Sequence, residues 1–185
     1  MATSHYYSAP DHLIGLDEWD ALPVDTSRRI ELVEGVLLVS PRPLIRHQDV
    51  VLRLASALRA ALPERWRALV EVEVVLGAGM TPTVRVPDVV VVPASSVDDR
   101  ARCDATEVAA VFEVLSPGTM RTDRVTKLHE YAEAGIPAYG VVEPGPPVTL
   151  SDFQLVDGAY VRVADHTGRS RMEIGDVVVD IDLDG

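Results

Sequence analysis

Two stretches, VRVPDVVVV at residues 84–92 and VAAVFEVL at residues 108–115, decide the fold of this chain. Both are runs of apolar, mostly β-branched residues, a pattern that predicts buried strands. Each run contains a single acid, Asp88 in the first and Glu113 in the second. An ionised carboxylate removed from water without a partner is destabilising by on the order of several kcal/mol, unless it becomes protonated. Two such acids in one core therefore predict a cation beside them.

The segment TDRVTKLHEYAEA at residues 122–134 predicts a helix that brings this cation. The helix is expected to stop at Gly135, and its apolar face is expected to contain Val125, Leu128 and Ala132. It carries Lys127, the only lysine among the 17 basic residues of the chain. A lysine kept in an arginine-rich chain favours a site that needs a compact ammonium able to change its protonation, which a guanidinium cannot do.

Simpler interpretations of Lys127 stay open from the residues alone. A single lysine can arise by chance. Asp123 lies one helical turn before it, so the two residues would also suit an ordinary i,i+4 ion pair at the surface. Tyr131 lies one turn after Lys127, where it would either pack or donate a hydrogen bond to a phosphate.

The remaining pattern predicts an α/β protein with one mixed sheet and helices packed on it. Residues 1–185 are expected to form a single domain. Helices are predicted at residues 16–21 and 44–62. Strands are predicted on either side of a Glu34-Gly35 turn and at residues 66–76, 83–92, 108–115 and 138–144, and an antiparallel meander is expected from Val148 onward. The strand after the Lys127 helix is expected to run parallel to the one that bears Glu113.

Composition narrows the class of function. The net charge is −12, which argues against a protein that binds nucleic acid with its whole surface, although the segment from Arg42 to Arg67 is locally basic. The single cysteine, Cys103, excludes an internal disulfide framework, and no Cys/His cluster has zinc spacing. Neither an export signal nor a membrane-spanning run is apparent, so a cytoplasmic protein with no membrane partner is expected.

The order Pro-Asp, acid and nearby lysine resembles the PD-(D/E)XK nucleases and, more narrowly, the Uma-two family of restriction endonucleases. The resemblance covers most of the chain. Its blocks are IELVEGVLLVSP, RHQDVVLRLASAL, VPDVVVV and FEVLSPGTMRTDRVTKLHEYAEAGIPAYGVVEP. It implies a restriction-endonuclease-like mixed sheet flanked by helices, with a site at Glu31, Asp88, Glu113 and Lys127. The chain departs from the pattern at Leu115, where the wider superfamily places the lysine, and at Gly140 and Glu143.

These residue types suit phosphodiester hydrolysis with a carboxylate-bound Mg²⁺ or Mn²⁺. We expect Asp88, Glu113 and the Val114 carbonyl to bind the metal. Glu31 would act through water or orient the substrate, and Lys127 would position the attacking water or stabilise negative charge. DNA is the expected partner, and a homodimer would cut both strands most simply.

Two alternatives belong to other classes of protein. One is a catalytically silent nuclease-fold protein that serves as a binding or assembly module, which the acidic charge favours. The other is a hydrolase triad of Ser116 with His47 or His129, but no GxSxG motif surrounds the serine.

Overall fold

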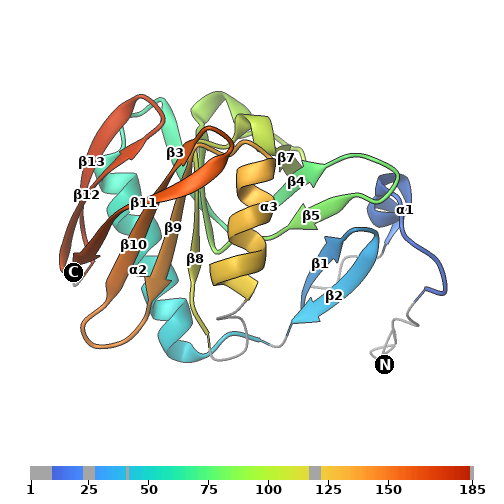
Figure 1. Ribbon diagram of the computed structural model, residues 1–185, viewed down its shortest axis with the longest axis horizontal. Helices are drawn as coiled ribbons and strands as arrows, with labels where there is room; N and C mark the ends of the chain where they lie inside the picture. Colours follow the sequence, from blue (N-terminus) through green and yellow to red (C-terminus); the bar gives the residue numbers. More distant parts are fainter. Residues whose placement is uncertain (1–9, 23–27, 41, 117–121, 184–185) are drawn as a thin grey trace.

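A computed structural model describes residues 10–22, 28–40, 42–116 and 122–183, and within them the strands form three sheets (Figure 1). Strands β1 (Arg29–Val33), β2 (Val36–Ser40), β4 (Glu73–Gly77), β5 (Thr83–Arg85) and β7 (Arg102–Asp104) form a sheet of order β2-β1-β5-β4-β7. Strands β3 (Trp66–Val70), β6 (Val89–Pro93), β8 (Ala110–Val114), β9 (Ala138–Glu143), β10 (Thr149–Val156) and β11 (Ala159–Thr167) form a sheet of order β11-β10-β9-β8-β6-β3. A separate hairpin pairs β12 (Arg169–Ile174) with β13 (Val177–Asp182).

The structure confirms the predicted α/β class, a mixed sheet and antiparallel strands at the C-terminal end. The prediction of one sheet is wrong, because the strands form three sheets. The strand expected at residues 66–76 is divided into β3 and β4, and the one expected at residues 83–92 into β5 and β6. Glu71 interrupts the first with a positive φ of 52°, and Pro87 interrupts the second because it has no N–H for a ladder. The chain thus crosses from one large sheet to the other near Glu71 and crosses back near Asp88. The Glu71 N–H donates to the Asp88 carbonyl across 3.3 Å, so a hydrogen bond joins the two crossing points.

The helices lie close to their predicted positions. They are α1 (Leu16–Ala21), α2 (Ile45–Ala61) and α3 (Lys127–Glu133), with short 3₁₀ turns η1 (Ala94–Ser96) and η2 (Ala105–Glu107). A π-helical turn, η3 (Thr122–Thr126), precedes α3. This wider turn rotates the expected apolar face, so Val125 is 60% exposed, whereas Lys127 and Tyr131 are buried. None of the helices in the described ranges is long and apolar enough to cross a bilayer.

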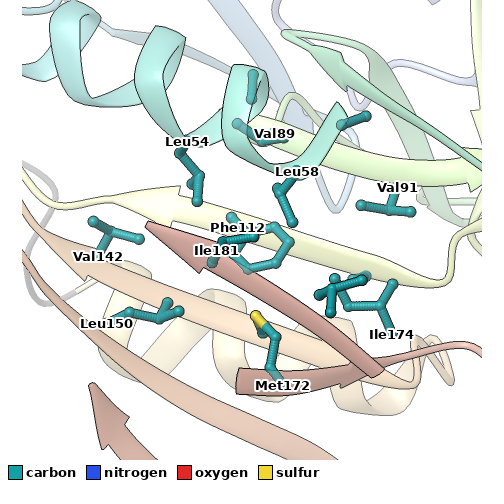
Figure 2. Packing of buried hydrophobic residues seen from close by; sticks show 14 of the residues in the cluster. Leu54, Leu58, Val89, Val91, Phe112, Val142, Leu150, Met172, Ile174 and Ile181 are labelled. Carbon is teal, nitrogen blue, oxygen red and sulfur yellow. The ribbon is translucent and has the colours of Figure 1, made fainter. Parts of the chain in front are cut away.

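The largest apolar core lies between α2, the six-stranded sheet and the β12–β13 hairpin (Figure 2). Leu54 and Leu58 of α2 meet Val89, Phe112 and Val142 of the sheet, and Met172 and Ile181 close the cluster from the hairpin. The alternation of β8 places Ala110, Phe112 and Val114 on this face. The side chains between them therefore face α3.

Gly140 lies beneath Phe112, where the strands leave no room for a side chain. A Cβ at this position would lie 2.3 Å from Phe112 Cδ1 and 3.0 Å from Leu150 Cδ1. The Phe112 ring therefore fills the space that a side chain at position 140 would need, which accounts for the glycine where this chain departs from the family pattern.

The opposite face of the six-stranded sheet packs against α3 through aromatic residues. Tyr139 of β9 lies 5.4 Å from Tyr131 of α3 and 5.6 Å from Tyr160 of β11, measured between ring centroids. The Tyr139 hydroxyl donates to the Asp123 carbonyl across 2.7 Å, which ties η3 to the sheet. Glu113 belongs to this same face of β8. The packing of α3 therefore determines what Glu113 meets.

Candidate active site at the junction of the sheets

The strand register brings the two core acids together. Val89 of β6 pairs with Phe112 of antiparallel β8, so Asp88 and Glu113 occupy the next pair of positions beyond that contact. Both side chains are buried, with 2% and 1% of their residue surface exposed. Asp88 lies where the chain crosses from β5 to β6, which places its carboxylate at the junction of the two large sheets.

Asp88 is held as a carboxylate by three donors. The Val114 N–H donates to Oδ2 across 2.7 Å, Arg29 Nη1 donates to Oδ1 across 2.7 Å, and His47 Nε2 lies 3.2 Å from Oδ2. Burial alone would raise the pKa of Asp88, but the His47 hydrogen bond and the charge of Arg29 outweigh it and lower the pKa to about 2. The same contact raises the pKa of His47 against the effect of its own burial.

Glu113 has fewer compensating contacts. Its Oε1 accepts hydrogen bonds from Lys127 Nζ across 2.8 Å and from the Tyr131 hydroxyl across 2.7 Å. Burial raises the pKa of Glu113 to about 7 although the Lys127 charge opposes it, and the nearby Asp88 charge adds to the rise. The two acids of the site thus differ in acidity because their surroundings differ.

Lys127 lies among three carboxylates. Its Nζ is 2.8 Å from Glu113 Oε1 and 3.5 Å from both Glu31 Oε1 and Asp123 Oδ1. Burial would lower the pKa of Lys127, but the charges of Glu113 and Glu31 raise it, so the ammonium stays protonated. The i,i+4 pair with Asp123 does form, but at a buried position, so the interpretation of Lys127 as a solvated surface residue is wrong.

Glu31 connects the five-stranded sheet to this cluster. Its Oε1 accepts the Val86 N–H across 3.0 Å, and its Oε2 accepts Arg85 Nη1 across 3.0 Å. Arg85 also binds Glu130 of α3 through two hydrogen bonds of 2.8 and 2.7 Å. Burial would raise the pKa of Glu31, but the charges of Lys127 and Arg85 lower it. Glu31 is therefore an ionised, fixed neighbour of Lys127.

Arg29, His47 and Arg85 complete the cluster, and sequence reasoning assigned no role to Arg29 or Arg85. Arg29 lies two residues before Glu31 in β1, and strand alternation places both on one face, so that spacing was an available signal. His47 appeared in the sequence only as a possible triad member, but it contacts Asp88 instead. His129 is exposed and pairs with Glu133, so neither histidine supports the triad interpretation.

The donors at this site are of the kind that Mg²⁺ and Mn²⁺ prefer. Asp88 and Glu113 supply carboxylate oxygens at neighbouring positions, and the Val114 carbonyl lies close enough to His47 to affect its pKa. Within the described residues, however, no group of three or more His, Cys, Asp or Glu side chains is arranged to hold a metal ion. The residues therefore fit a carboxylate-bound cation in type, while the Arg29 guanidinium bridges the two acids.

Comparison with known proteins identifies the lineage. The Uma2 family model, described as "Putative restriction endonuclease", matches residues 16–184. The chain belongs to the Uma2 family. The resemblance found in the sequence is thereby confirmed, and a nuclease is the class of protein that this family description supports. No curated protein matches the Uma2 chain.

A solved structure shares the fold of this Uma2 protein. It is described as a putative nuclease belonging to DUF820 from Anabaena variabilis ATCC 29413. The two are 19% identical, the match covers 88% of this chain and 89% of the other, and the TM-score is 0.66. At this identity the likeness supports the architecture alone, which agrees with the predicted nuclease-like mixed sheet.

Proposed function

We propose that this protein is a metal-dependent endonuclease that hydrolyses phosphodiester bonds in DNA. The observation that supports this best is the meeting of Asp88, Glu113 and Lys127 from three separate segments of the chain. Glu113 accepts from Lys127 across 2.8 Å, and Arg29 joins Glu113 to Asp88. Packing alone would not select so many buried charges, because removing each from water is costly. The family description is consistent with this function.

Asp88 and Glu113 would hold Mg²⁺ or Mn²⁺, with the Val114 carbonyl beside them. Such an ion, when bound, offsets charge on the phosphate and makes a bound water more acidic. The chain itself keeps the acids in place for this task. The Val114 N–H and His47 orient Asp88, and the Tyr131 hydroxyl orients Glu113.

Lys127 is the residue best suited to act on the reacting atoms. Its ammonium is kept charged by Glu113 and Glu31, so it can donate hydrogen bonds to an attacking water or to a phosphate oxygen. Glu31 would help Glu113 to fix Lys127, because Arg85 and the Val86 N–H hold the Glu31 carboxylate 3.5 Å from the ammonium.

A catalytically silent binding or assembly module is the second candidate, and two observations favour it. The acids are almost wholly buried, and the net charge of −12 opposes backbone binding to DNA except over a locally basic surface. In that case the charged cluster would serve only to join the two large sheets.

Incubation of supercoiled plasmid with purified protein and Mg²⁺ or Mn²⁺ separates the two candidates. We expect nicking by the wild type and a loss of about 10²–10³-fold or more in Asp88→Asn and Lys127→Met. The matched control is Asp152→Asn, which changes another buried carboxylate, on β10, and should leave the rate unchanged.

Two outcomes contradict the proposal. Equal nicking by all variants would indicate a contaminating nuclease, and DNA binding without nicking by the folded wild type would favour the module. Cutting of both strands by one site per chain is simplest in a homodimer, which sedimentation of the protein with and without a DNA duplex would detect.

A further inference from the structure

We propose that Arg29 occupies the place of the divalent cation, so that a bound cation and the Arg29 guanidinium are mutually exclusive partners of Asp88 and Glu113. This inference rests on the proposed function, because it assumes that these two acids take a divalent cation. It extends the role of Arg29 from a structural bridge between the two acids to a competitor of the cation, and it gives the metal-free protein a defined resting state.

The contacts of Arg29 are those of an internal counter-ion. Nη1 lies 2.7 Å from Asp88 Oδ1, and Nη2 lies 3.8 Å from Glu113 Oε2. Arg29 belongs to β1 of the five-stranded sheet, whereas Glu113 belongs to β8 of the six-stranded sheet and Asp88 lies directly before β6 of that sheet. The guanidinium therefore reaches across the junction to the oxygens that a cation would use.

The fit of Arg29 is incomplete, which distinguishes it from the other two cations of the site. Its Nη2 is buried and has no hydrogen-bond partner among the described residues. Lys127, by contrast, donates to Glu113 at 2.8 Å, and Arg85 binds Glu31 and Glu130 through short contacts. A buried donor without an acceptor costs free energy, so Arg29 is the cation that leaves with the least loss.

Charge and exposure favour the same residue. A guanidinium does not lose its proton, so Arg29 can leave the acids only by moving and not by becoming neutral. Its single charge faces two carboxylates, whereas a divalent cation brings twice that charge. The Arg29 side chain is 16% exposed, compared with 2% for either acid, so its way out leads towards solvent. Once displaced, its planar fork stays at the rim of the site, where it suits a phosphate.

Calorimetric titration with Mn²⁺ tests the competition directly. We expect Arg29→Gln to bind Mn²⁺ about tenfold more tightly than the wild type or better, because the cation no longer displaces a charged side chain. Arg53→Gln is the matched control. Arg53 is also a partly buried arginine paired with a carboxylate, Asp49, at 3.1 Å, but it lies in α2. The affinity of Arg53→Gln for Mn²⁺ should equal that of the wild type. Equal or weaker binding by folded Arg29→Gln would overturn the inference.

A second measurement uses the wild-type protein and does not depend on the folding of a variant. The arginine Nε–Hε signals in labelled wild-type protein would be followed during addition of Mg²⁺, and the Arg29 signal would be assigned by through-bond correlation to its own backbone in the same ¹³C,¹⁵N-labelled protein. Displacement predicts a large, saturable change of this one signal. A bound cation that leaves the Arg29 signal unchanged would also overturn the inference.

Failure of this inference is distinguishable from failure of the proposed function. If the wild type and Arg29→Gln bind Mn²⁺ equally, and Asp88→Asn binds none, only the competition is wrong. If none of these proteins binds Mn²⁺ while all remain folded, the metal-dependent function is wrong and the inference fails with it.

Discussion

Phe112 and Glu113 are neighbours in β8, and both are almost completely buried, yet the two faces of the strand are stabilised in opposite ways. Phe112 lies in an apolar cluster beneath α2, where removal of apolar surface from water stabilises the fold. Glu113 lies on the α3 side, where burial raises its pKa and the charges of Lys127 and Arg29, with the hydrogen bond from Tyr131, offset part of the cost. The stability of the Phe112 face therefore depends on how well the apolar side chains fit together. The stability of the Glu113 face depends on keeping every charged or hydrogen-bonding partner of the carboxylate.

The largest effect is expected where a partner is removed from the charged face. Lys127→Met should destabilise the protein by about 3–5 kcal/mol, because Glu113 and Glu31 lose their shared cation. Adding Glu113→Gln should restore part of that loss. Denaturant unfolding of the two single variants and the double variant gives the coupling energy. Strictly additive effects would show that the pair is not coupled.

A smaller loss is expected where shape is violated on the apolar face. Gly140→Ala should destabilise by about 1–3 kcal/mol, because the new methyl group would meet the Phe112 ring at 2.3 Å. Phe112→Leu in the same chain should relieve the clash. The control is Gly145→Ala, since a Cβ there has no neighbour closer than 3.9 Å. Thermal unfolding that ranks Gly145→Ala as the worse variant would contradict this packing.

The pH dependence of stability sharpens the contrast further. The pKa of Glu113 is raised to about 7 in the fold, so the folded protein holds this proton more tightly than the unfolded chain does. The stability that protonated Glu113 contributes to the fold is therefore fully present below about pH 4.5 and is lost as the pH rises towards 7. Asp88, with a pKa lowered to about 2, contributes in the opposite sense: its stabilisation is present above about pH 3.8 and is lost as the pH falls towards 2.

In EDTA, the free energy of unfolding of Glu113→Gln should rise by about 1–2 kcal/mol relative to that of the wild type between pH 5 and pH 8. The variant has no carboxylate at this position, so it avoids the loss of stability that ionisation of Glu113 causes in the wild type. Urea unfolding at the two pH values measures the difference. A gap between the two proteins that does not change with pH would show that Glu113 is not the group responsible.

The smallest effect is expected where a charge lies on neither face of β8. Asp49→Ala removes an exposed pair with Arg53 on α2 and should change stability by less than about 0.5 kcal/mol. A loss above about 1 kcal/mol in the same unfolding assay would mean that surface pairs contribute far more here than the buried network implies.

The sequence predicted the elements well and their division into sheets poorly. The periodicity of α2, the Glu34-Gly35 turn and the parallel pairing of β8 with β9 are local or nearly local properties, and each is as expected. The breaks at Glu71 and Pro87 were missed because a run of β-branched residues looks the same whether it continues in one sheet or crosses to another.

Some of the candidate site residues could be found from the sequence, and others were missed. Asp88 and Glu113 stood out as single acids in apolar runs, and Lys127 stood out as the only lysine of the chain. The structure brings these three residues together with Glu31. Arg29 and Arg85 were given no role because arginine is common in this chain, although the spacing of Arg29 from Glu31 and the place of Arg85 inside the run at residues 84–92 were available signals. Contacts between sheets depend on how the sheets dock, which a single sequence does not specify.

The double crossing between the sheets also governs when the charged cluster can exist. Arg29, Glu31 and Arg85 arrive with one sheet, Asp88 and Glu113 with the other, and Lys127 with the helix after them. A chain in which the two sheets and α3 have not yet docked therefore lacks the assembled set of charged residues. Any activity that needs the whole cluster therefore depends on completion of the fold.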